Sequence, residues 1–555
     1  MSTFRTLPRD TNQALGIAQY AIDFMRQGAP SPAVLERTNL FHTDATLCGL
    51  SALALGTNAP NLLRREAMQY AVPPGDHGAG LGKSKHHGAT FFGSLQGGKQ
   101  MRVKAEKAIV ANCAAVREWD SNGTNFGYDP DRGNTAGEFG HNDFYPVAMA
   151  AAQMLGAEGA TALRGMVCID EIRGRLAEVF SLKSYKVDHV VHGAIGSAAT
   201  FGAMVGATPE QIESAIGMFV AHHIPFRAIR AGKQLSDSKG SSAAISTEAA
   251  ILCVKRSMAG FLGPRDIFRN PEAIFRIFEG PGQMFERVGA TKRRSDEATK
   301  GGEAAAKAAE SKRDASPFDL HLAMDGDDFT VMGMHFKLGL YEHQSAGALQ
   351  AMITLLGKSP DLLKGEDAIK TIKIVAYEPA FGIIGDPAKR KPTTRQSADH
   401  SMVYIVATLL RKAIEQKAAG WTELMLEPED YSPRAIENPL TRRLMDKIEF
   451  AHGGGEYDSR YPDGIPTSVV ITDGAGKTHD SGLVMYPGGH ARNAKGQTPV
   501  DLRAVLNHKF ALLGGLVETD PAEIIARYSG LEKKSAADVQ AINDFDLKIG
   551  ASFEG

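Results

Sequence analysis

The chain has 555 residues, of which 43% are hydrophobic and 23% are charged, proportions typical of globular proteins with a sizeable core. Its length predicts roughly two to four domains, or one large core with an added lobe. The formal net charge of −2 provides no global positive field, which argues against a protein that binds nucleic acid or anionic membranes through charge. An acidic substrate would therefore need a local cationic pocket.

Cysteine usage and hydropathy argue against further classes of protein. No apolar run is long enough to span a bilayer, and residues 1–10 lack the apolar stretch of a signal peptide. We therefore expect a cytoplasmic protein with no membrane partner; a mitochondrial matrix location stays open for a eukaryotic source. Because the cysteines are far apart and form no CxxC pair, we expect reduced buried thiols, no metal and no iron–sulfur cluster. The cysteines are Cys48, Cys113, Cys168 and Cys253.

The N-terminal half and the C-terminal end are predicted to be helical. Residues 145–156 and 194–206 have the Ala, Met and Gly composition of tightly packed buried helices. Residues 208–211 (TPEQ) form a capping box with Pro at the first helical position, and residues 520–523 (DPAE) repeat this pattern. Near the N-terminus, one helical face is formed by Ala14, Ala18, Ala21 and Met25.

The region between these helices changes character. Residues 371–377 (TIKIVAY) alternate like a half-buried strand, and a helical segment follows at 401–416. Strand-like residues 468–472 and 478–486 flank Asp473-Gly474, which is a hairpin signal. These patterns predict a mixed α/β lobe inserted into a helical domain.

The element order thus predicts a mostly α fold. The helical domain is expected over residues 1–280 and 491–555, and the α/β domain over residues 281–490. Residues 291–316 mix Lys, Arg, Asp and Glu without bulky apolar side chains. This composition favours a solvated linker or short surface helix over a nucleic-acid-binding patch.

Two motifs suggest nucleotide or metal binding, but their spacing supports neither. Residues 78–84 (GAGLGKS) look like a phosphate-binding loop, yet His77 occupies the place of its first glycine and no apolar strand precedes it. We expect a flexible surface loop there. The adjacent histidine pairs at 86–87 and 222–223 point apart on a helix or strand, so neither pair is expected to chelate a metal alone.

Three sites place acid–base groups among small residues. Asp120 and Thr124 are four residues apart, so they share a helical face or converge across a turn; Asp120 alone could equally cap a helix. His141 follows in a glycine-rich loop, which positions a side chain with little bulk of its own. Asp188 precedes His189 at a predicted helix entrance and could orient it or raise its basicity, although a core histidine has the same spacing.

Cations and further histidines follow along the chain. The cations Arg230, Lys233 and Lys239 lie among Gly and Ser residues. This composition suits a turn that binds carboxylates, or an exposed basic loop. Together these groups predict a cationic, histidine-bearing pocket that binds a polycarboxylate. The predicted binding residues are Arg230, Lys233, His400, Tyr404 and His490, with Lys239 as a further cation.

Several stretches in a fixed order carry a family resemblance. Residues 111–120 (ANCAAVREWD) followed by Thr124 look like the signature NG-A-VRELDF-DT, and residues 397–404 (SADHSMVY) look like TADHSLPY. Together the stretches resemble the MmgE/PrpD family, specifically its 2-methylcitrate dehydratase branch. They are residues 111–124, 188–190, 230–240, 317–320 with 336–337, 397–404 and 486–490.

The resemblance implies a large helical domain formed by both chain ends, a smaller α/β lid, a homodimer and no cofactor. It implies active-site roles for Asp120, Thr124, His141, His189 and Lys239.

The sequence departs from the family pattern near the expected pocket. Gly123 stands where the family has a second Asp, Asn142 where it has a Pro, and Ser238 where it has a Trp. The chain over residues 124–141 is longer than usual, and the histidine segment at 341–345 is out of register. These changes bear on the substrate more than on the fold.

The resemblance predicts a hydro-lyase that eliminates water from 2-methylcitrate or a similar tricarboxylate and gives the unsaturated acid. Lys239, with Arg230, would stabilise the carboxylate charge, while His141 and His189 would be the acid–base pair. Asp120 would orient a histidine or act as an alternative base. Which group is acid and which is base stays open.

Other functions also stay open. A cis-aconitate decarboxylase or a dicarboxylate epimerase would use the same proton transfer next to a carboxylate. A non-catalytic helical binding protein is an alternative from another class, and a nucleotide-binding protein based on residues 78–84 has the least support.

Overall fold

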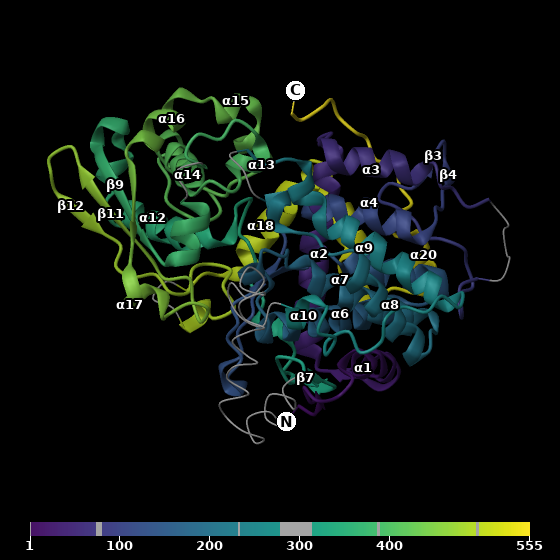
Figure 1. The fold of residues 1–555 in the computed structure, drawn as a ribbon. Helices are drawn as coiled ribbons and strands as arrows, with labels where there is room; N and C mark the ends of the chain where they lie inside the picture. Colours follow the sequence, from purple (N-terminus) through teal and green to yellow (C-terminus); the bar gives the residue numbers. More distant parts are fainter. Residues whose placement is uncertain are drawn as a thin grey trace, which may run out of the picture.

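In this computed structural model, two lobes are visible (Figure 1). The helical lobe contains α1 to α10 and α18 to α20, and the sheet lobe contains α12 to α17 and β9 to β12. The described chain is rich in helix and carries only small sheets. Lys233 and most of the predicted linker at 291–316 lie outside the described residues. The structure describes residues 2–73, 80–230, 234–277, 314–385, 389–495 and 499–554.

The helical lobe packs around α7 (Val190–Val205), which contacts α1, α5, α6, α8 and α9. Small residues allow this close approach. A Cβ added at Gly196 would lie 3.0 Å from the backbone oxygen of Ile169, and one at Gly193 would overlap the ring of Phe144. The predicted buried helix is confirmed, because almost all residues of α7 are buried.

The other helices of this lobe agree with the sequence pattern near both chain ends. Thr208 and Gln211 form the predicted capping box, whereas Asp520 caps its helix by accepting only from the Ala522 N–H, without the box predicted there. The helices are α1 (Gln13–Gln27), α2 (Pro32–Ala54), α3 (Asn58–Met68), α4 (Ala105–Glu118), α5 (Tyr145–Leu155), α6 (Gly159–Val179), α8 (Pro209–His222), α9 (Asp237–Met258), α10 (Ile274–Ile277), α18 (Leu502–Gly515), α19 (Pro521–Tyr528) and α20 (Ala536–Ala541).

The chain between the two lobes returns to the N-terminal end. β7 (Leu320–Ala323) pairs antiparallel with β1 (Phe4–Leu7), and β8 (Asp325–Gly326) pairs parallel with β2 (Ala29–Pro30). Residues 320–326 were expected in the inserted domain, but backbone pairing with β1 and β2 places them on the helical lobe. A further small hairpin joins β3 (Leu95–Gln96) and β4 (Lys99–Gln100).

The sheet lobe is built on β9 (Ile369–Ala376), which pairs parallel with β10 (Ile448–His452) and antiparallel with β11 (Thr467–Asp473). β12 (Thr478–Asp480) completes the predicted hairpin. This strand is shorter than predicted, because Gly482 has a φ of +68° and turns the chain. The helices are α12 (Ala346–Lys358), α13 (Arg395–Ala398), α14 (Met402–Gln416), α15 (Pro433–Ile436), α16 (Pro439–Asp446) and α17 (Gly454–Asp458).

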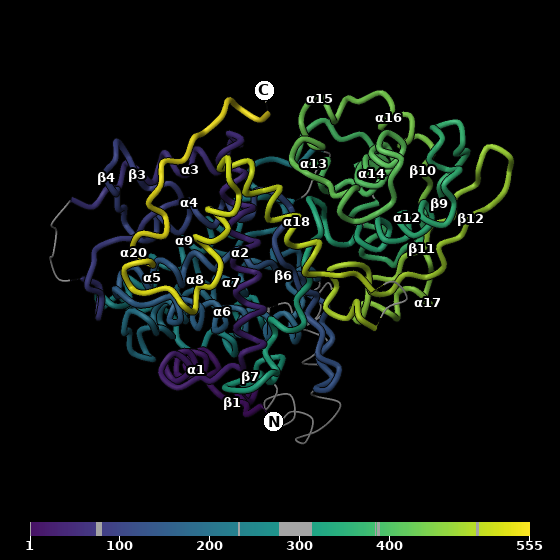
Figure 2. Tube along the Cα trace, turned by 180° about the vertical axis from the view of Figure 1, so that it is seen from behind, coloured from purple at the N-terminus to yellow at the C-terminus, as the bar shows by residue number. Residues whose placement is uncertain are grey.

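The C-terminal segment leaves the sheet lobe and packs back on the helical lobe. α18 and α19 contact α2, and α20 contacts α5 and α6. Figure 2 shows this segment running over the helical lobe. Among the described helices, none combines the length and the hydropathy required to cross a membrane.

Candidate active site

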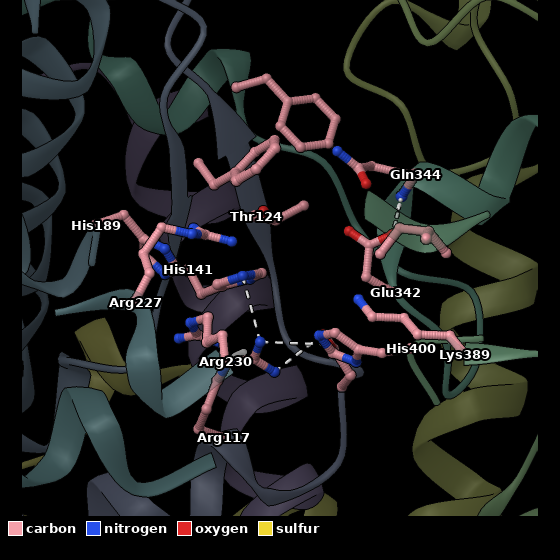
Figure 3. A pocket seen from close by; sticks show the side chains of 14 residues that line it. Arg117, Thr124, His141, His189, Arg227, Arg230, Glu342, Gln344, Lys389 and His400 are labelled. Atoms are coloured by element: carbon pink, nitrogen blue, oxygen red, sulfur yellow. Dashed lines mark hydrogen bonds and ion pairs between the residues drawn. The ribbon is translucent and has the colours of Figure 1, made fainter. Parts of the chain in front are cut away.

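A cavity lies at the junction of the lobes, beside the end of α4 and the hairpin formed by β5 (Thr124–Phe126) and β6 (Phe139–His141) (Figure 3). The structure brings most of the predicted site residues to this cavity and adds others. The predicted residues that line it are Asp120, Thr124, His141, His189, Arg230 and His400. The added residues are Arg117, Phe126, Phe139, Arg227, Glu342, Gln344, Ile384 and Lys389.

Asp120 is the centre of a buried ion network. α4 ends at Glu118, so Asp120 lies in the turn that leads to Thr124, which agrees with the turn rather than the shared helical face. Its carboxylate pairs with Arg117 at 2.9 Å and accepts from Lys337. Burial raises the pKa of Asp120, but the cationic neighbours outweigh burial and hold the pKa well below its usual range.

Asp399, a carboxylate from the sheet lobe, extends this network. Asp399 Oδ1 lies 2.9 Å from Lys239 Nζ and 2.7 Å from His400 Nδ1. His400 Nε2 in turn lies 3.1 Å from Asp120 Oδ2. Burial and the Lys239 charge lower the pKa of His400 to about 3, so its imidazole is neutral at neutral pH. Lys239 does not line the cavity; it lies behind Asp120, with 3.7 Å between Nζ and Oδ2.

His141 and His189 face each other with ring centroids 5.3 Å apart. His141 ends β6 opposite Thr124, whose hydroxyl donates to the Gly140 carbonyl at 2.8 Å. Burial, with the nearby guanidinium of Arg117, holds the pKa of His141 well below its usual range. Among the described residues, His141 Nδ1 and both ring nitrogens of His189 have no hydrogen-bond partner. Two neutral imidazoles therefore offer nitrogen atoms to a ligand.

Asp188 lies beside His189 and also pairs with an arginine. It accepts from Arg230 Nε at 2.5 Å and lies 3.6 Å from His189 Nδ1. The Asp188 charge raises the pKa of His189, but burial lowers this pKa more, so the pKa of His189 lies well below its usual range. Asp188 also fixes the Arg230 guanidinium.

Three polar side chains that the sequence did not single out also line the cavity. Arg227 has a buried Nη1 atom, and Gln344 has a buried side-chain amide, for which the described part of the chain provides no hydrogen-bond partner. Glu342 accepts the Gln344 N–H at 2.8 Å. Burial, helped by the negative charge of Asp120, raises the pKa of Glu342 to about 8. Buried polar atoms without partners indicate a site that a polar ligand completes.

Comparison with protein families agrees with this geometry. Residues 16–286 match the MmgE/PrpD N-terminal domain, and residues 341–524 match the MmgE/PrpD C-terminal domain. The two matches cover more than half of the chain. The protein belongs to the MmgE/PrpD family. Members of this family are generally hydro-lyases, so membership supports a dehydratase-type lyase.

The three positions that depart from the MmgE/PrpD pattern have different surroundings in the structure. A Cβ at Gly123 would lie 2.5 Å from the Phe41 ring, so this position has no room for the family's Asp side chain. Asn142 is buried and accepts from the Asn122 amide at 3.0 Å. Ser238 is exposed on the first turn of α9 and does not line the cavity.

Two predicted binding residues lie outside the cavity of this MmgE/PrpD protein, and a third is not described. The Tyr404 hydroxyl donates to the Asp430 carbonyl at 2.5 Å within the sheet lobe. His490 stacks on His335 with ring centroids 4.1 Å apart. Neither residue is among those that line the cavity, and Lys233 lies outside the described residues.

One group of potential metal ligands is found among the described residues: Asp120, Asp399 and His400. Its carboxylates are already bonded to side-chain cations, since Lys337 and Arg117 contact Asp120 and Lys239 contacts Asp399. The ammonium and guanidinium groups thus neutralise the charge that a metal ion would otherwise neutralise.

Proposed function

We propose that the protein is a cofactor-independent hydro-lyase that eliminates water from 2-methylcitrate or a similar tricarboxylate. One observation carries the proposal: Arg117, Arg227 and Arg230 line the same cavity as two histidines that burial keeps neutral. Guanidinium groups bind carboxylates, and a neutral imidazole can accept a proton from carbon. Membership in the MmgE/PrpD family supports a dehydratase-type lyase activity.

The three arginines differ in whether a carboxylate of the protein pairs with them. Arg117 pairs with Asp120, and Arg230 pairs with Asp188. No ion pair within 4.0 Å joins Arg227 to any described carboxylate, and its Nη1 atom is buried without a hydrogen-bond partner. Burial lowers the pKa of Arg227, which reflects the cost of keeping this charge without a close counterion. A substrate carboxylate would supply that counterion.

Elimination of water needs a base for the C–H proton next to a carboxylate and a way to stabilise the negative charge that develops there. We assign the base to His141 or His189, because both are neutral, line the cavity and have ring nitrogen atoms without a hydrogen-bond partner among the described residues. Arg230 would stabilise the reacting carboxylate as its charge increases, and Arg227 would bind a carboxylate of the substrate in the ground state. Thr124 would accept or donate a hydrogen bond to the substrate from the β5–β6 hairpin.

Lys239 is then a positioning residue. It holds Asp399 at 2.9 Å, and Asp399 holds His400 at 2.7 Å. This chain fixes the orientation of His400 against Asp120 and thereby the shape of the cavity wall.

The family resemblance also leads us to propose a homodimer. Phe261 and Leu262, directly after α9, are 55% and 81% exposed, which is unusual for large apolar side chains. Light scattering coupled to size exclusion would give the mass directly; a monomer at micromolar concentration would contradict this part of the proposal.

The test of the activity is formation of the conjugated acid. Purified protein in excess chelator is incubated with 2-methylcitrate or citrate, and the ultraviolet absorbance of the enoate is followed. We expect a rise with at least one acid, abolished in the double variant His141→Ala/His189→Ala. Release of CO₂, or inversion at carbon without a new double bond, would instead indicate a decarboxylase or an epimerase and overturn the proposal.

A further inference from the structure

Glu342 lies on the wall of the cavity that the sheet lobe contributes. Its backbone N–H donates to the Asp399 carbonyl at 3.1 Å, and its side chain caps the short 3₁₀ turn His343–Ser345 by accepting the Gln344 N–H at 2.8 Å. Figure 3 shows Glu342 across the cavity from His141 and His189, with Thr124 between them. A carboxyl group therefore faces the two imidazoles from the other lobe.

The surroundings of Glu342 favour its neutral form. Burial comes first, the charge of Asp120 adds to it, and Lys337 opposes both; the pKa is raised to about 8. Of the carboxyl groups that line the cavity, Asp120 is ionised by its cations, whereas Glu342 keeps its proton at neutral pH. The charged or titratable groups that face Glu342 are Asp120, Lys337, Lys389, Tyr377 and Tyr461.

We propose that Glu342 is the catalytic acid that donates its proton to the departing hydroxyl group. This inference rests on the proposed hydro-lyase activity. It assigns the acid to the sheet lobe and the base to the histidines of the helical lobe, a division that the sequence leaves open.

The elimination of water conserves atoms and charge. His141 or His189 takes the proton from carbon, and the C–H electron pair forms the new double bond. The C–O bond breaks with its electron pair going to oxygen, and the Glu342 proton joins that oxygen to form water. The products are an imidazolium, a Glu342 carboxylate, water and the unsaturated acid. Proton exchange with solvent restores both groups before the next turnover.

The alternative role for Glu342 is structural, as a cap of the turn at His343–Ser345. Glutamine separates the two roles, because its side-chain oxygen can still accept the Gln344 N–H while its amide is no acid. A matched control exists in Glu178, which is buried and likewise has a pKa raised to about 8, but pairs with Arg175 and does not line this cavity.

The experiment measures two reactions of the full-length protein in D₂O with the substrate it turns over. One is formation of the double bond, and the other is exchange of the substrate C–H proton for deuterium. In Glu342→Gln we expect elimination to fall about 10²- to 10⁴-fold, with exchange retained within several-fold. In the wild type we expect kcat to decrease on the alkaline side, near the Glu342 pKa of about 8, and in Glu342→Gln this decrease should be absent. Glu178→Gln should keep the wild-type elimination rate and pH profile.

Other outcomes would overturn either the acid role of Glu342 or the proposed function. If Glu342→Gln eliminates water within twofold of the wild type with the same alkaline decrease, Glu342 is not the acid. If a folded Glu342→Gln variant loses exchange and elimination equally, the residue positions the substrate or the base, and the acid role is overturned. If the wild type shows neither reaction with any tricarboxylate or dicarboxylate tested, the proposed function fails instead.

Discussion

At the scale of single residues, the cavity side chains divide into those bonded within the protein and those with unused polar atoms. Asp120 belongs to the first group, since its carboxylate forms ion pairs with Arg117 and Lys337. His189, Gln344 and Arg227 belong to the second, because each has at least one buried polar atom without a partner in the described chain. The first group fixes the shape of the cavity, and the second group can gain hydrogen bonds from a substrate.

Arg227→Gln tests the second group. Loss of a guanidinium that binds a carboxylate should raise KM about 10- to 100-fold, with a smaller change in kcat, because ground-state binding depends on this contact. Steady-state kinetics with the productive substrate gives both constants. Arg503→Gln is the control: Arg503 is an arginine with a side chain 53% exposed that pairs with Glu36 far from the cavity. An unchanged KM in Arg227→Gln would contradict the assignment of Arg227 as the carboxylate anchor.

Glu342 should also make stability depend on pH. Its folded-state pKa of about 8 lies above the ordinary value of 4.5, so the folded protein binds a proton that the unfolded chain releases between these values. Its contribution to stability is complete below pH 4.5 and is lost as the pH rises through about 8. Glu342→Gln does not titrate, so its Tm relative to the wild type should increase from about pH 5 to about pH 8. A difference in Tm that is independent of pH would show that Glu342 is ionised in the folded protein.

The sequence predicted the site residues to which the family resemblance assigns roles better than the other residues of the cavity. The family resemblance implied active-site roles for Asp120, His141 and His189, and the structure brings all three to the cavity. Arg227 lies outside the matched stretches, and Gln344 lies in the segment at 341–345 that is out of register. Their importance depends on which polar atoms stay unpaired after folding. That property arises from the packing of distant segments and is not visible in local spacing.

At the scale of elements, the long connection between Thr124 and His141 is tied to α6 rather than free. The Ala136 N–H donates to the Glu178 carbonyl at 2.9 Å, and Arg175 pairs with Asp129 at 3.0 Å. The extra length is visible in the sequence, but these anchors are not, because they involve an element far along the chain. The connection therefore supports the β5–β6 hairpin that carries His141.

The small residues of α7 lead to a prediction about packing. A Cβ at Gly193 would lie 1.9 Å from Phe144, which follows shortly after His141. Gly193→Ala should therefore cost about 1–3 kcal/mol of unfolding free energy and lower kcat/KM as Phe144 moves. Chemical denaturation and kinetics measure both effects.

The matched control is Gly357→Ala in α12, where an added Cβ meets nothing within 4 Å. Alanine there should stabilise the protein by about 0.5–1 kcal/mol, since helix formation favours Ala over Gly. Equal stability of the two variants would contradict the close packing of α7 against Phe144.

At the scale of the whole molecule, buried ion pairs join the two lobes around the cavity. Lys239 of α9 pairs with Asp399, and Arg395 of α13 pairs with Glu118 at the end of α4. The pattern of helices and strands indicated two structural units, but it gave no information about these contacts, which depend on how the units are docked. Because the pairs are buried on both sides, removing one partner leaves an unpaired charge in the interior.

Lys239→Met tests this coupling of the lobes. It leaves Asp399 with weaker partners, His400 at 2.7 Å and Arg395 at 3.6 Å, so we expect a loss of about 3–5 kcal/mol in unfolding free energy. Lys239→Met/Asp399→Asn removes both charges and should recover part of this stability, but not activity, because His400 loses its support. Lys364→Met, which removes an exposed pair with Asp361, should change stability little. Denaturant titration of these variants together with Asp399→Asn gives the coupling energy of the pair. A coupling energy near zero would mean that Lys239 does not join the lobes, whereas recovered activity in the double variant would show that the network is not required for catalysis.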